Sequence, residues 1–271
     1  MKVLVCINNS KDVDGKCKNQ LINVLTKYSL EFDIVYNNEQ IISNDYSALF
    51  VVGGDGTILQ YVEFSSLNKI PIISINAGKL GFLTEFEYEN IEEAVSLFVN
   101  NELVKDERAT LKYEDNNQIF YALNDVVIQR IYTDTQGMLV SVRVYLDNTL
   151  IDDISGDGVI VNTPTGSTAY SLSVGGSILA PGINAFAVSP IASHSFNQRP
   201  VIFSSDKTCK LVYQKGTSAG IFVDGRFVKS LKENDEIIIN KAELPTIFLR
   251  KKDSDFFKRL TEKLKYRAGD L

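Results

Sequence analysis

The sequence of 271 residues has one histidine, three cysteines and no tryptophan. A zinc site usually needs four Cys and His ligands, which His194 and three distant cysteines cannot assemble. The same scarcity would make a Ser-His-Asp mechanism depend on one residue, so we expect His194 to be structural. The number of cysteines is odd, and Cys6, Cys17 and Cys209 are widely spaced. This pattern is typical of reduced thiols and predicts a cytoplasmic location.

Positive charge is scarcer than negative charge. Lys and Arg number 28 against 34 Asp and Glu, which gives a net charge of -6. This balance argues against a general nucleic-acid surface. No hydrophobic run approaches the length of a membrane span, and the apolar stretch 3–7 is too short for a secretory signal. We therefore expect neither nucleic acid nor a membrane as a partner.

The first hundred residues alternate strand-like and helix-like segments, which is typical of an α/β domain with a parallel sheet. Between Ile91 and Val99, apolar residues recur at helical spacing, and Asn90 with Glu93 predicts a capping arrangement at the start of this helix. The predicted strands are 3–7, 32–35, 48–52 and 70–75.

After about residue 105 the apolar period changes to two, which predicts a β-rich domain. The predicted strands are 120–130, 139–147, 210–214, 220–228 and 236–239. Within 220–228, Asp224-Gly225 predicts the two-residue turn of a hairpin. Near the C-terminus, an apolar face formed by Phe256, Phe257, Leu260 and Leu264 predicts a helix, capped by Ser254, that returns to the first domain. We expect an α/β domain at 1–105 with 250–271, and a β-rich domain at 106–249.

Two common nucleotide-binding signatures are missing: G-x-x-x-x-G-K-[ST], and a G-x-G-x-x-G that opens a helix. Instead, the run Gly53-Gly54-Asp55-Gly56-Thr57 directly follows the apolar segment 48–52. Such a glycine-rich turn lets backbone amides approach a phosphate closely. An acid in the turn would repel the phosphate unless it binds Mg²⁺ or receives a proton. The alternative is a strand-to-helix turn whose Asp caps the helix.

A second unusual segment spans residues 155–176, where eight of 22 residues carry a hydroxyl group and five are glycine. Small hydroxyl residues among glycines offer many hydrogen bonds at close approach, as a nucleotide site requires. The alternative is a Ser/Thr/Gly surface loop. The apolar segment 159–161 inside this stretch favours the binding interpretation.

Together these segments resemble the NAD kinase family, and the resemblance covers most of the chain. It rests on motifs in the family's order and approximate spacing: Gly53 to Thr57, Leu80-Gly81-Phe82-Leu83, Asn124-Asp125, Asp157-Gly158 and Thr163 to Gly176. Lipid kinases, such as diacylglycerol kinases, and 6-phosphofructokinases have similar GGDGT turns and are the alternatives. Neither has a counterpart of residues 164–170.

The resemblance implies an α/β domain, a β-rich domain and a C-terminal segment that returns to the first. The implied reaction is a Mg²⁺-dependent transfer of the terminal phosphoryl group of ATP, or of polyphosphate, to the 2′-hydroxyl of the adenosine ribose of NAD, which gives NADP. The family also implies a homodimer or homotetramer with a site shared between subunits.

The resemblance assigns roles to individual residues. Asp55 would be the catalytic proton acceptor and the contact to Mg²⁺. The backbone amides of Gly53, Gly54, Gly56 and Thr57 would bind the phosphate donor. The implied NAD-binding residues are Asp55, Gly56, Phe82, Asn124, Asp125, Asp157, Thr165, Thr168, Ala169, Tyr170, Ser171, Leu172 and Ser173.

Two positions depart from the family pattern. Asp125 stands where Glu is usual, which shortens the reach of the carboxylate by one methylene, and Ser155 stands where many members carry a basic residue. Asp224 falls near the family's site, although a hairpin turn explains it fully. A non-catalytic dinucleotide sensor is the remaining alternative, and Asp55 argues against it because binding alone needs no acid beside phosphates.

Overall fold

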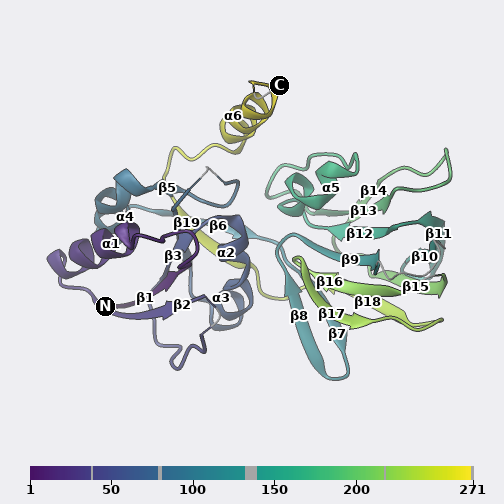
Figure 1. Cartoon of the computed structure of the whole chain (residues 1–271), viewed down its shortest axis with the longest axis horizontal. Coiled ribbons are helices and arrows are strands. Elements are labelled where there is room, and N and C mark those ends of the chain that lie inside the picture. Colours follow the sequence, from purple (N-terminus) through teal and green to yellow (C-terminus); the bar gives the residue numbers. More distant parts are fainter. Residues whose placement is uncertain (38, 79–80, 132–138, 217, 270–271) are drawn as a thin grey trace. The chain divides into compact units, whose positions relative to one another are not determined.

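The computed structural model describes residues 1–37, 39–78, 81–131, 139–216 and 218–269. These residues form two compact units, Met1–Glu107 with Thr246–Leu271 (unit 1) and Arg108–Pro245 (unit 2) (Figure 1). Leu80, which belongs to one motif of the resemblance, lies outside the described residues.

Unit 1 is built on a sheet with the strand order β2-β1-β3-β4-β19-β6, in which β2, β1, β3, β4 and β19 pair in parallel and β5 pairs in parallel with β4. Its strands are β1 (Lys2–Ile7), β2 (Glu31–Tyr36), β3 (Leu49–Gly53), β4 (Ile72–Asn76), β5 (Phe86–Glu87), β6 (Val104–Arg108) and β19 (Thr246–Arg250). Its helices are α1 (Lys16–Lys27), α2 (Asp55–Leu59), α3 (Val62–Asn68), the 3₁₀ turn η1 (Tyr88–Asn90), α4 (Ile91–Val99) and α6 (Phe256–Gly269).

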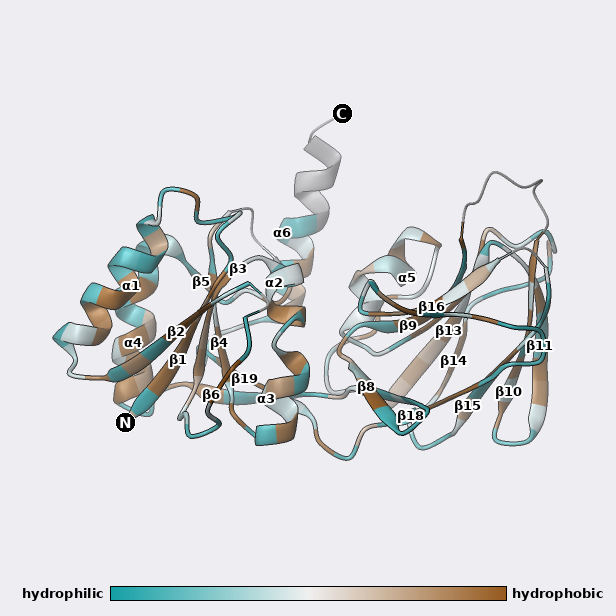
Figure 2. Cartoon of the chain, turned by 60° about the horizontal axis from the view of Figure 1, so that its bottom comes forward, coloured by the Kyte–Doolittle hydropathy of each residue, from teal (hydrophilic) through white to brown (hydrophobic). Residues whose placement is uncertain are grey.

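Helices cover both faces of the sheet in unit 1. Successive side chains of a strand point to opposite faces, so Val3 and Val5 pack with Leu21 of α1 and Val95 of α4 in one core. Cys6 points to the other face, where Tyr61 lies between α2 and α3. Strands buried on both faces explain why the sequence is apolar almost without interruption in β1 and β3. Figure 2 shows these strands in brown and α1 with both hydrophilic and hydrophobic residues.

Unit 2 is a sandwich of two antiparallel sheets. One has the order β11-β10-β15-β18-β7-β8, and the other the order β14-β13-β12-β9-β16-β17. The strands are β7 (Leu111–Asp115), β8 (Gln118–Ala122), β9 (Asp125–Arg130), β10 (Val140–Leu146), β11 (Thr149–Gly156), β12 (Gly158–Asn162), β13 (Ala185–Ile191), β14 (Val201–Ser204), β15 (Cys209–Lys215), β16 (Ala219–Val223), β17 (Arg226–Ser230) and β18 (Glu236–Lys241). The 3₁₀ turn η2 (Gly166–Thr168) and α5 (Tyr170–Ser173) follow β12.

The two faces of the β9–β12 pair differ in what they cover. Val126, Ile128, Val159 and Val161 point into the core between the two sheets. Residues of the opposite parity point to the face that carries α5. The sandwich therefore presents one sheet face to a segment rich in hydroxyl groups.

The fold class predicted from the sequence is confirmed, with two local differences. The single strand predicted for 120–130 is wrong, because β8 ends at Ala122 and β9 begins at Asp125. The predicted cap at Asn90 is also wrong, since its side chain makes no capping hydrogen bond. The hairpin turn at Asp224-Gly225 is confirmed, and both residues have positive φ, 46° and 76°.

The C-terminal helix lies in unit 1, as predicted, although its cap differs from the prediction. Asp255 Oδ1 accepts hydrogen bonds from the amides of Phe257 and Lys258, which makes Asp255 the capping residue. The Ser254 hydroxyl instead donates to Glu85. In the part of the chain that is described, no helix is long and apolar enough to span a membrane.

Candidate functional site

The glycine-rich turn of unit 1 lies where α/β sheets commonly bind ligands. The strand order changes direction between β1 and β3, and ligands occupy the crevice outside the carboxyl ends of strands at such a point. Asn8 follows β1, and Thr57 lies in the first turn of α2, which starts directly after the glycine pair at the end of β3. The side-chain amide of Asn8 donates to Thr57 Oγ1 at 2.8 Å, which joins the loop after β1 to α2.

The glycines of this turn differ in the space around them. An ideal Cβ at Gly53 would lie 2.4 Å from Thr57 Oγ1, so a side chain there would displace the Thr57 side chain. Gly54 and Gly56 have no heavy atom within 4 Å of such a Cβ, so they border open space. The backbone amide of Thr57, which was predicted to bind phosphate, already donates a hydrogen bond to the Gly54 carbonyl at 2.9 Å. This amide is therefore engaged within α2.

Asp55 is held by a loop that follows β4. Its Oδ2 accepts a hydrogen bond from the Phe82 amide at 2.8 Å, and its Oδ1 accepts one from the Leu83 amide at 3.0 Å. Each carboxylate oxygen keeps a second lone pair that can accept a proton or contact a cation. Phe82 is half-buried, and the Lys263 ammonium lies 5.2 Å from its ring centroid. The loop thus fixes the direction of the Asp55 carboxylate.

The donor set around Asp55 limits how Mg²⁺ can bind. Within the described ranges, no three His, Cys, Asp or Glu side chains are grouped closely enough to hold a metal ion. Mg²⁺ is commonly bound by one or two carboxylates together with substrate phosphates and water. Asp55 therefore fits a Mg²⁺ that arrives on the phosphates, and not a metal held by the protein alone.

In unit 2, Asp224 organises the turn that contains Asn124 and Asp125. Its Oδ2 accepts from the Leu123 amide at 2.8 Å, and its Oδ1 accepts from the amides of Asn124 and Asp125 at 2.8 and 3.0 Å. The turn is thereby drawn out of the strand ladder, which explains the break between β8 and β9. Asp224 was expected only to form a hairpin, and an Asp-Gly dipeptide gives no sign of this second function.

The opposite side of the same turn is held by the segment after β12. The Thr163 hydroxyl donates to the Leu123 carbonyl and the Thr163 amide donates to the Asn124 carbonyl at 2.9 Å. An ideal Cβ at Gly166 would lie 2.0 Å from the Asn124 carbonyl oxygen, so only glycine allows this approach. Two motifs that are distant in the sequence are therefore in direct contact.

Asp125 is a buried acid with a perturbed pKa. Burial, and then the neighbouring Asp224, raise the pKa of Asp125 to about 7. Asn162 is its direct neighbour on β12. Asn162 is fully buried, and its side-chain oxygen has no hydrogen-bond partner among the described residues. This end of the sheet thus carries three polar side chains: Asp125 of β9, Asn162 of β12, and Asp224 of the turn between β16 and β17.

The hydroxyl-rich segment divides into buried and accessible residues. Thr165 Oγ1 accepts from Arg108 at 3.3 Å, and the Thr168 hydroxyl donates to the Thr165 carbonyl at 3.1 Å. Ser171 is fully buried, with its hydroxyl 3.3 Å from that of Ser189, so its side chain packs inside unit 2. Between residues 165 and 173, the predicted binding residues that are exposed or half-buried are Ala169, Tyr170, Leu172 and Ser173.

Tyr170 and Asp157 lie at different places relative to β9 and β12. Tyr170 packs on a cluster that includes Val127 and Ile160, in the middle of the sheet face. Asp157 precedes β12, while Thr163 follows it, so about five residues or roughly 17 Å of strand separate the two ends. The predicted binding residues of unit 2 therefore extend along a strand and do not converge on one point.

Asp157 and Ser155 each contact a neighbouring segment of unit 2. Arg130 Nη1 lies 3.5 Å from Asp157 Oδ1, and the Arg130 amide donates to the Asp157 carbonyl. The Ser155 carbonyl accepts a hydrogen bond from the backbone amide of His194 at 3.0 Å.

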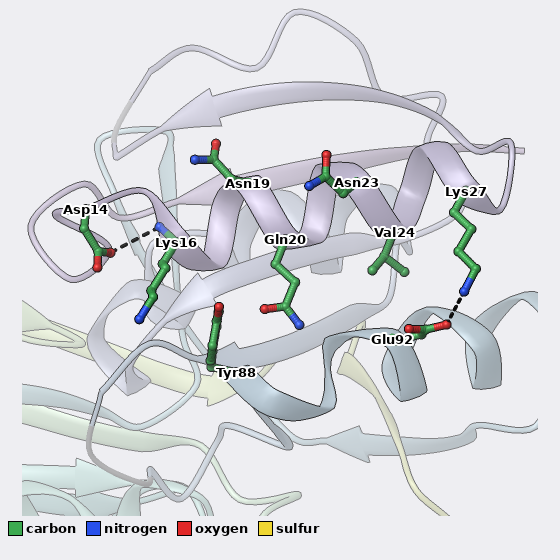
Figure 3. A pocket seen from close by; sticks show the side chains of 9 residues that line it. All are labelled: Asp14, Lys16, Asn19, Gln20, Asn23, Val24, Lys27, Tyr88 and Glu92. Atoms are coloured by element: carbon green, nitrogen blue, oxygen red, sulfur yellow. Dashed lines mark hydrogen bonds and ion pairs between the residues drawn. The ribbon is translucent and has the colours of Figure 1, made fainter.

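A groove in unit 1 contains none of the predicted site residues. Its volume is about 450 Å³, and it lies between α1 and the segment formed by η1 and α4 (Figure 3). Lys27 and Glu92 form an ion pair of 2.5 Å at one end. Its lining residues are Asp14, Lys16, Asn19, Gln20, Asn23, Val24, Lys27, Tyr88 and Glu92. None of these lining residues belongs to the predicted site around Asp55, so we assign no catalytic function to the groove.

Comparisons with known proteins match both units. The model of the ATP-NAD kinase N-terminal domain matches residues 6–103, and that of the ATP-NAD kinase C-terminal domain matches residues 123–250. The NAD kinase of Caldicellulosiruptor bescii is 32% identical over 265 residues, which cover 98% of this chain and all of that protein. The NAD kinase of Methanothermobacter thermautotrophicus is 33% identical over 227 residues, which cover 83% of this chain and 79% of that protein.

Two solved structures share the fold. An NAD kinase from Archaeoglobus fulgidus in complex with ATP has a TM-score of 0.81 and 27% identity, and the match covers 98% of this chain and 99% of that one. Yeast NADH kinase complexed with NADH has a TM-score of 0.83 and 21% identity, and the match covers 98% of this chain and 88% of that one.

Proposed function

Because this chain belongs to the NAD kinase family, we propose that it transfers the terminal phosphoryl group of ATP to the 2′-hydroxyl of the adenosine ribose of NAD and so produces NADP. The observation that carries this proposal is the match of both family domains, over residues 6–103 and 123–250. The A. fulgidus relative with bound ATP supports ATP as the donor.

We assign the catalytic proton acceptor to Asp55. Phosphoryl transfer passes through a loose transition state, so positioning and charge neutralisation supply most of the catalysis and a strong base is not needed. A carboxylate can accept the hydroxyl proton as the bond to phosphorus forms. The amides of Phe82 and Leu83 leave one lone pair on each Asp55 oxygen for this purpose.

A divalent cation, Mg²⁺, would supply charge neutralisation at the phosphates. The single carboxylate of Asp55 agrees with an ion held mainly by the nucleotide. The amides of Gly53, Gly54 and Gly56 are proposed to contact the donor phosphates, and Gly54 and Gly56 border open space.

The dinucleotide is proposed to lie along the sheet face of unit 2 that carries α5. Asn124 and Asp125 would contact a ribose or amide edge, because an amide donates and accepts while a carboxylate binds adjacent hydroxyls. Thr165, Thr168 and Tyr170 would contact the adenine and its neighbours, and Asp157 would contact the far end of an extended dinucleotide. The length of β12 between Asn162 and Asp157 supports an elongated ligand.

The oligomeric state and the cellular location are proposed from the family. We expect a homodimer or homotetramer in which a neighbouring subunit completes the site, and a cytoplasmic location. The three cysteines of the described structure are unpaired and buried, which agrees with reduced thiols. Light scattering after gel filtration would measure the oligomeric state.

One assay tests the proposed function. Formation of NADP, or of NADPH, is measured with ATP or polyphosphate as donor and with NAD or NADH as acceptor, and we expect turnover with NAD and Mg²⁺-ATP. Asp55→Asn should lose most turnover while NAD binding, measured by calorimetry, stays within about threefold, because the side-chain amide of Asn cannot accept the proton and its NH₂ group faces one of the two loop amides that hold the carboxylate. If NAD binds and no NADP forms with any donor, the protein is a dinucleotide sensor. Parallel loss of binding and turnover would make Asp55 a ligand contact only.

A further inference from the structure

A single peptide group joins Asp55 to the C-terminal helix. The carbonyl of Phe82 and the amide of Leu83 belong to the same planar peptide unit, and they point in opposite directions because the bond is trans. The amide donates to Asp55 Oδ1 at 3.0 Å, and the carbonyl accepts from Arg259 Nη1 at 3.1 Å. Any rotation of this peptide plane would break both hydrogen bonds together.

Arg259 holds the same loop at two further atoms. Its Nη1 also donates to the Thr84 carbonyl at 2.8 Å, and its Nη2 forms an ion pair of 2.7 Å with Glu85 Oε2. The planar guanidinium therefore contacts three residues of the loop, Phe82, Thr84 and Glu85, which a lysine cannot reproduce with one ammonium group. All of these residues lie in unit 1.

The arginine is itself fixed by a buried ion cluster. Glu85, whose side chain is 3% exposed, also accepts from Arg250 at 2.8 Å, and Arg250 is bonded to Asp106. Buried, charge-assisted hydrogen bonds of this kind define geometry more tightly than solvated surface pairs do. The loop that orients Asp55 is thus attached to both β19 and α6.

We propose that Arg259 is a positioning residue for phosphoryl transfer, which acts through the Phe82–Leu83 peptide group to fix the direction of the Asp55 carboxylate. The proposal rests on the catalytic role assigned to Asp55 above. Transfer of a proton to a carboxylate depends on the alignment of the lone pair with the hydroxyl group, so a loosened loop lowers turnover more than it lowers binding. The C-terminal helix is then part of the catalytic apparatus, and not only a closing element of unit 1.

The first test compares full-length Arg259→Ala and Arg259→Lys with Lys258→Ala, which removes a neighbouring charge that is exposed on the same helix. Circular dichroism confirms folding, and Arg259→Lys serves if Arg259→Ala does not fold. We expect kcat to fall about tenfold or more in the Arg259 variants, with the KM for NAD changed less than about threefold. Folded Arg259 variants with wild-type kcat would overturn the proposal.

Hydrogen exchange supplies a readout that is independent of turnover. The amides of Phe82 and Leu83 should exchange faster in the Arg259 variants than in the wild type or in Lys258→Ala, because the peptide plane is no longer held. Unchanged exchange at these two amides would contradict the proposed link.

A double-mutant cycle separates this proposal from the role of Asp55. If Arg259 acts through Asp55, Arg259→Lys should lower kcat much less in an Asp55→Asn background than in the wild type. Equal losses in both backgrounds would show that Arg259 acts elsewhere and would overturn the inference alone. Wild-type kcat in Asp55→Asn itself would remove Asp55 from the reaction, and the inference with it.

Discussion

Gly81 lies so close to Asp55 that an ideal Cβ at residue 81 would stand 1.9 Å from Asp55 Oδ1. No side chain can occupy that space without moving the carboxylate or the loop. The Gly81 amide also donates to the Thr84 hydroxyl at 3.0 Å, so the loop has little freedom to retreat. The absence of a side chain at Gly81 therefore determines where Asp55 can lie.

The first prediction is that Gly81→Ala lowers kcat for NADP formation about tenfold or more, because the methyl group displaces the Asp55 carboxylate. Steady-state kinetics at saturating NAD and ATP measure the effect. Gly78→Ala is the matched control, since a Cβ there meets no heavy atom within 4 Å. If both variants keep wild-type kcat, the position of Asp55 against the loop has no bearing on the reaction.

The sequence predicted unit 1 well because its strands are apolar on both faces and its helices have regular periodicity. The helix expected at 91–99 is present as α4, with the same limits. The glycine-rich turn was found because glycine and acid directly follow a buried strand. Neither pattern reveals that Phe82 and Leu83 hold Asp55, because the hydrogen bonds come from backbone amides, which nearly every residue type has.

Contacts between distant segments explain what the sequence could not predict in unit 2. The break at 123–124 depends on Asp224, about one hundred residues away, and on Thr163. Asn124 and Asp125 are residue types that strands disfavour, but a polar pair inside an otherwise strand-like run does not by itself locate a break, which here depends on the tertiary contacts. Likewise, nothing in the order of residues distinguishes Ser171, which is buried, from the exposed Ser173.

The second prediction concerns Asp224. Asp224→Asn keeps a residue that tolerates positive φ, but it replaces one acceptor oxygen by an NH₂ group that faces backbone donors. We expect the free energy of unfolding to fall by about 2–3 kcal/mol, measured by urea denaturation at pH 7. The KM for NAD should rise as well, because the turn that carries Asn124 loses its support.

The control for this prediction is Asp206→Asn, which changes an exposed aspartate of unit 2. It should alter the free energy of unfolding by less than about 0.5 kcal/mol. Similar stability of the two variants would mean that the hydrogen bonds to the amides of residues 123–125 contribute nothing measurable.

The third prediction is a pH dependence that arises from Asp125. Burial and the charge of Asp224 raise the pKa of Asp125 to about 7 in the folded state, against about 3.9 for an aspartate in an unfolded chain. Between these two pKa values the carboxyl group is protonated in the folded state and ionised in the unfolded state, so the free energy of unfolding falls as the pH rises from about 4 to 7. Above pH 7 the stabilising contribution of this proton is lost, which lowers the free energy of unfolding by up to about 4 kcal/mol.

Asp125→Asn removes this ionisation while it keeps the size of the side chain. The variant should therefore gain stability relative to the wild type on going from pH 5 to pH 8, as measured by denaturant titrations at each pH. The pKa of Asp224 is also raised by burial, so its ionisation contributes a pH dependence of the same sign in both the wild type and Asp125→Asn. Parallel stability curves for the wild type and Asp125→Asn would contradict the buried, protonated state of Asp125.

The fourth prediction tests the ligand face of unit 2 through Tyr170, whose half-buried ring packs on the cluster that includes Val127, Ile160 and Ile191. An aromatic ring beside a base contributes about 1–3 kcal/mol to binding, so Tyr170→Ala should raise the Kd for NAD about tenfold or more, with kcat at saturating NAD reduced much less. Isothermal titration calorimetry and steady-state kinetics measure the two quantities separately. Tyr170→Phe is the matched control, because it keeps the ring and removes only the hydroxyl group, and it should bind NAD within about threefold of the wild type. An unchanged KM for NAD in Tyr170→Ala would exclude the ring from the dinucleotide site, whereas equal weakening in both variants would assign the contact to the hydroxyl group.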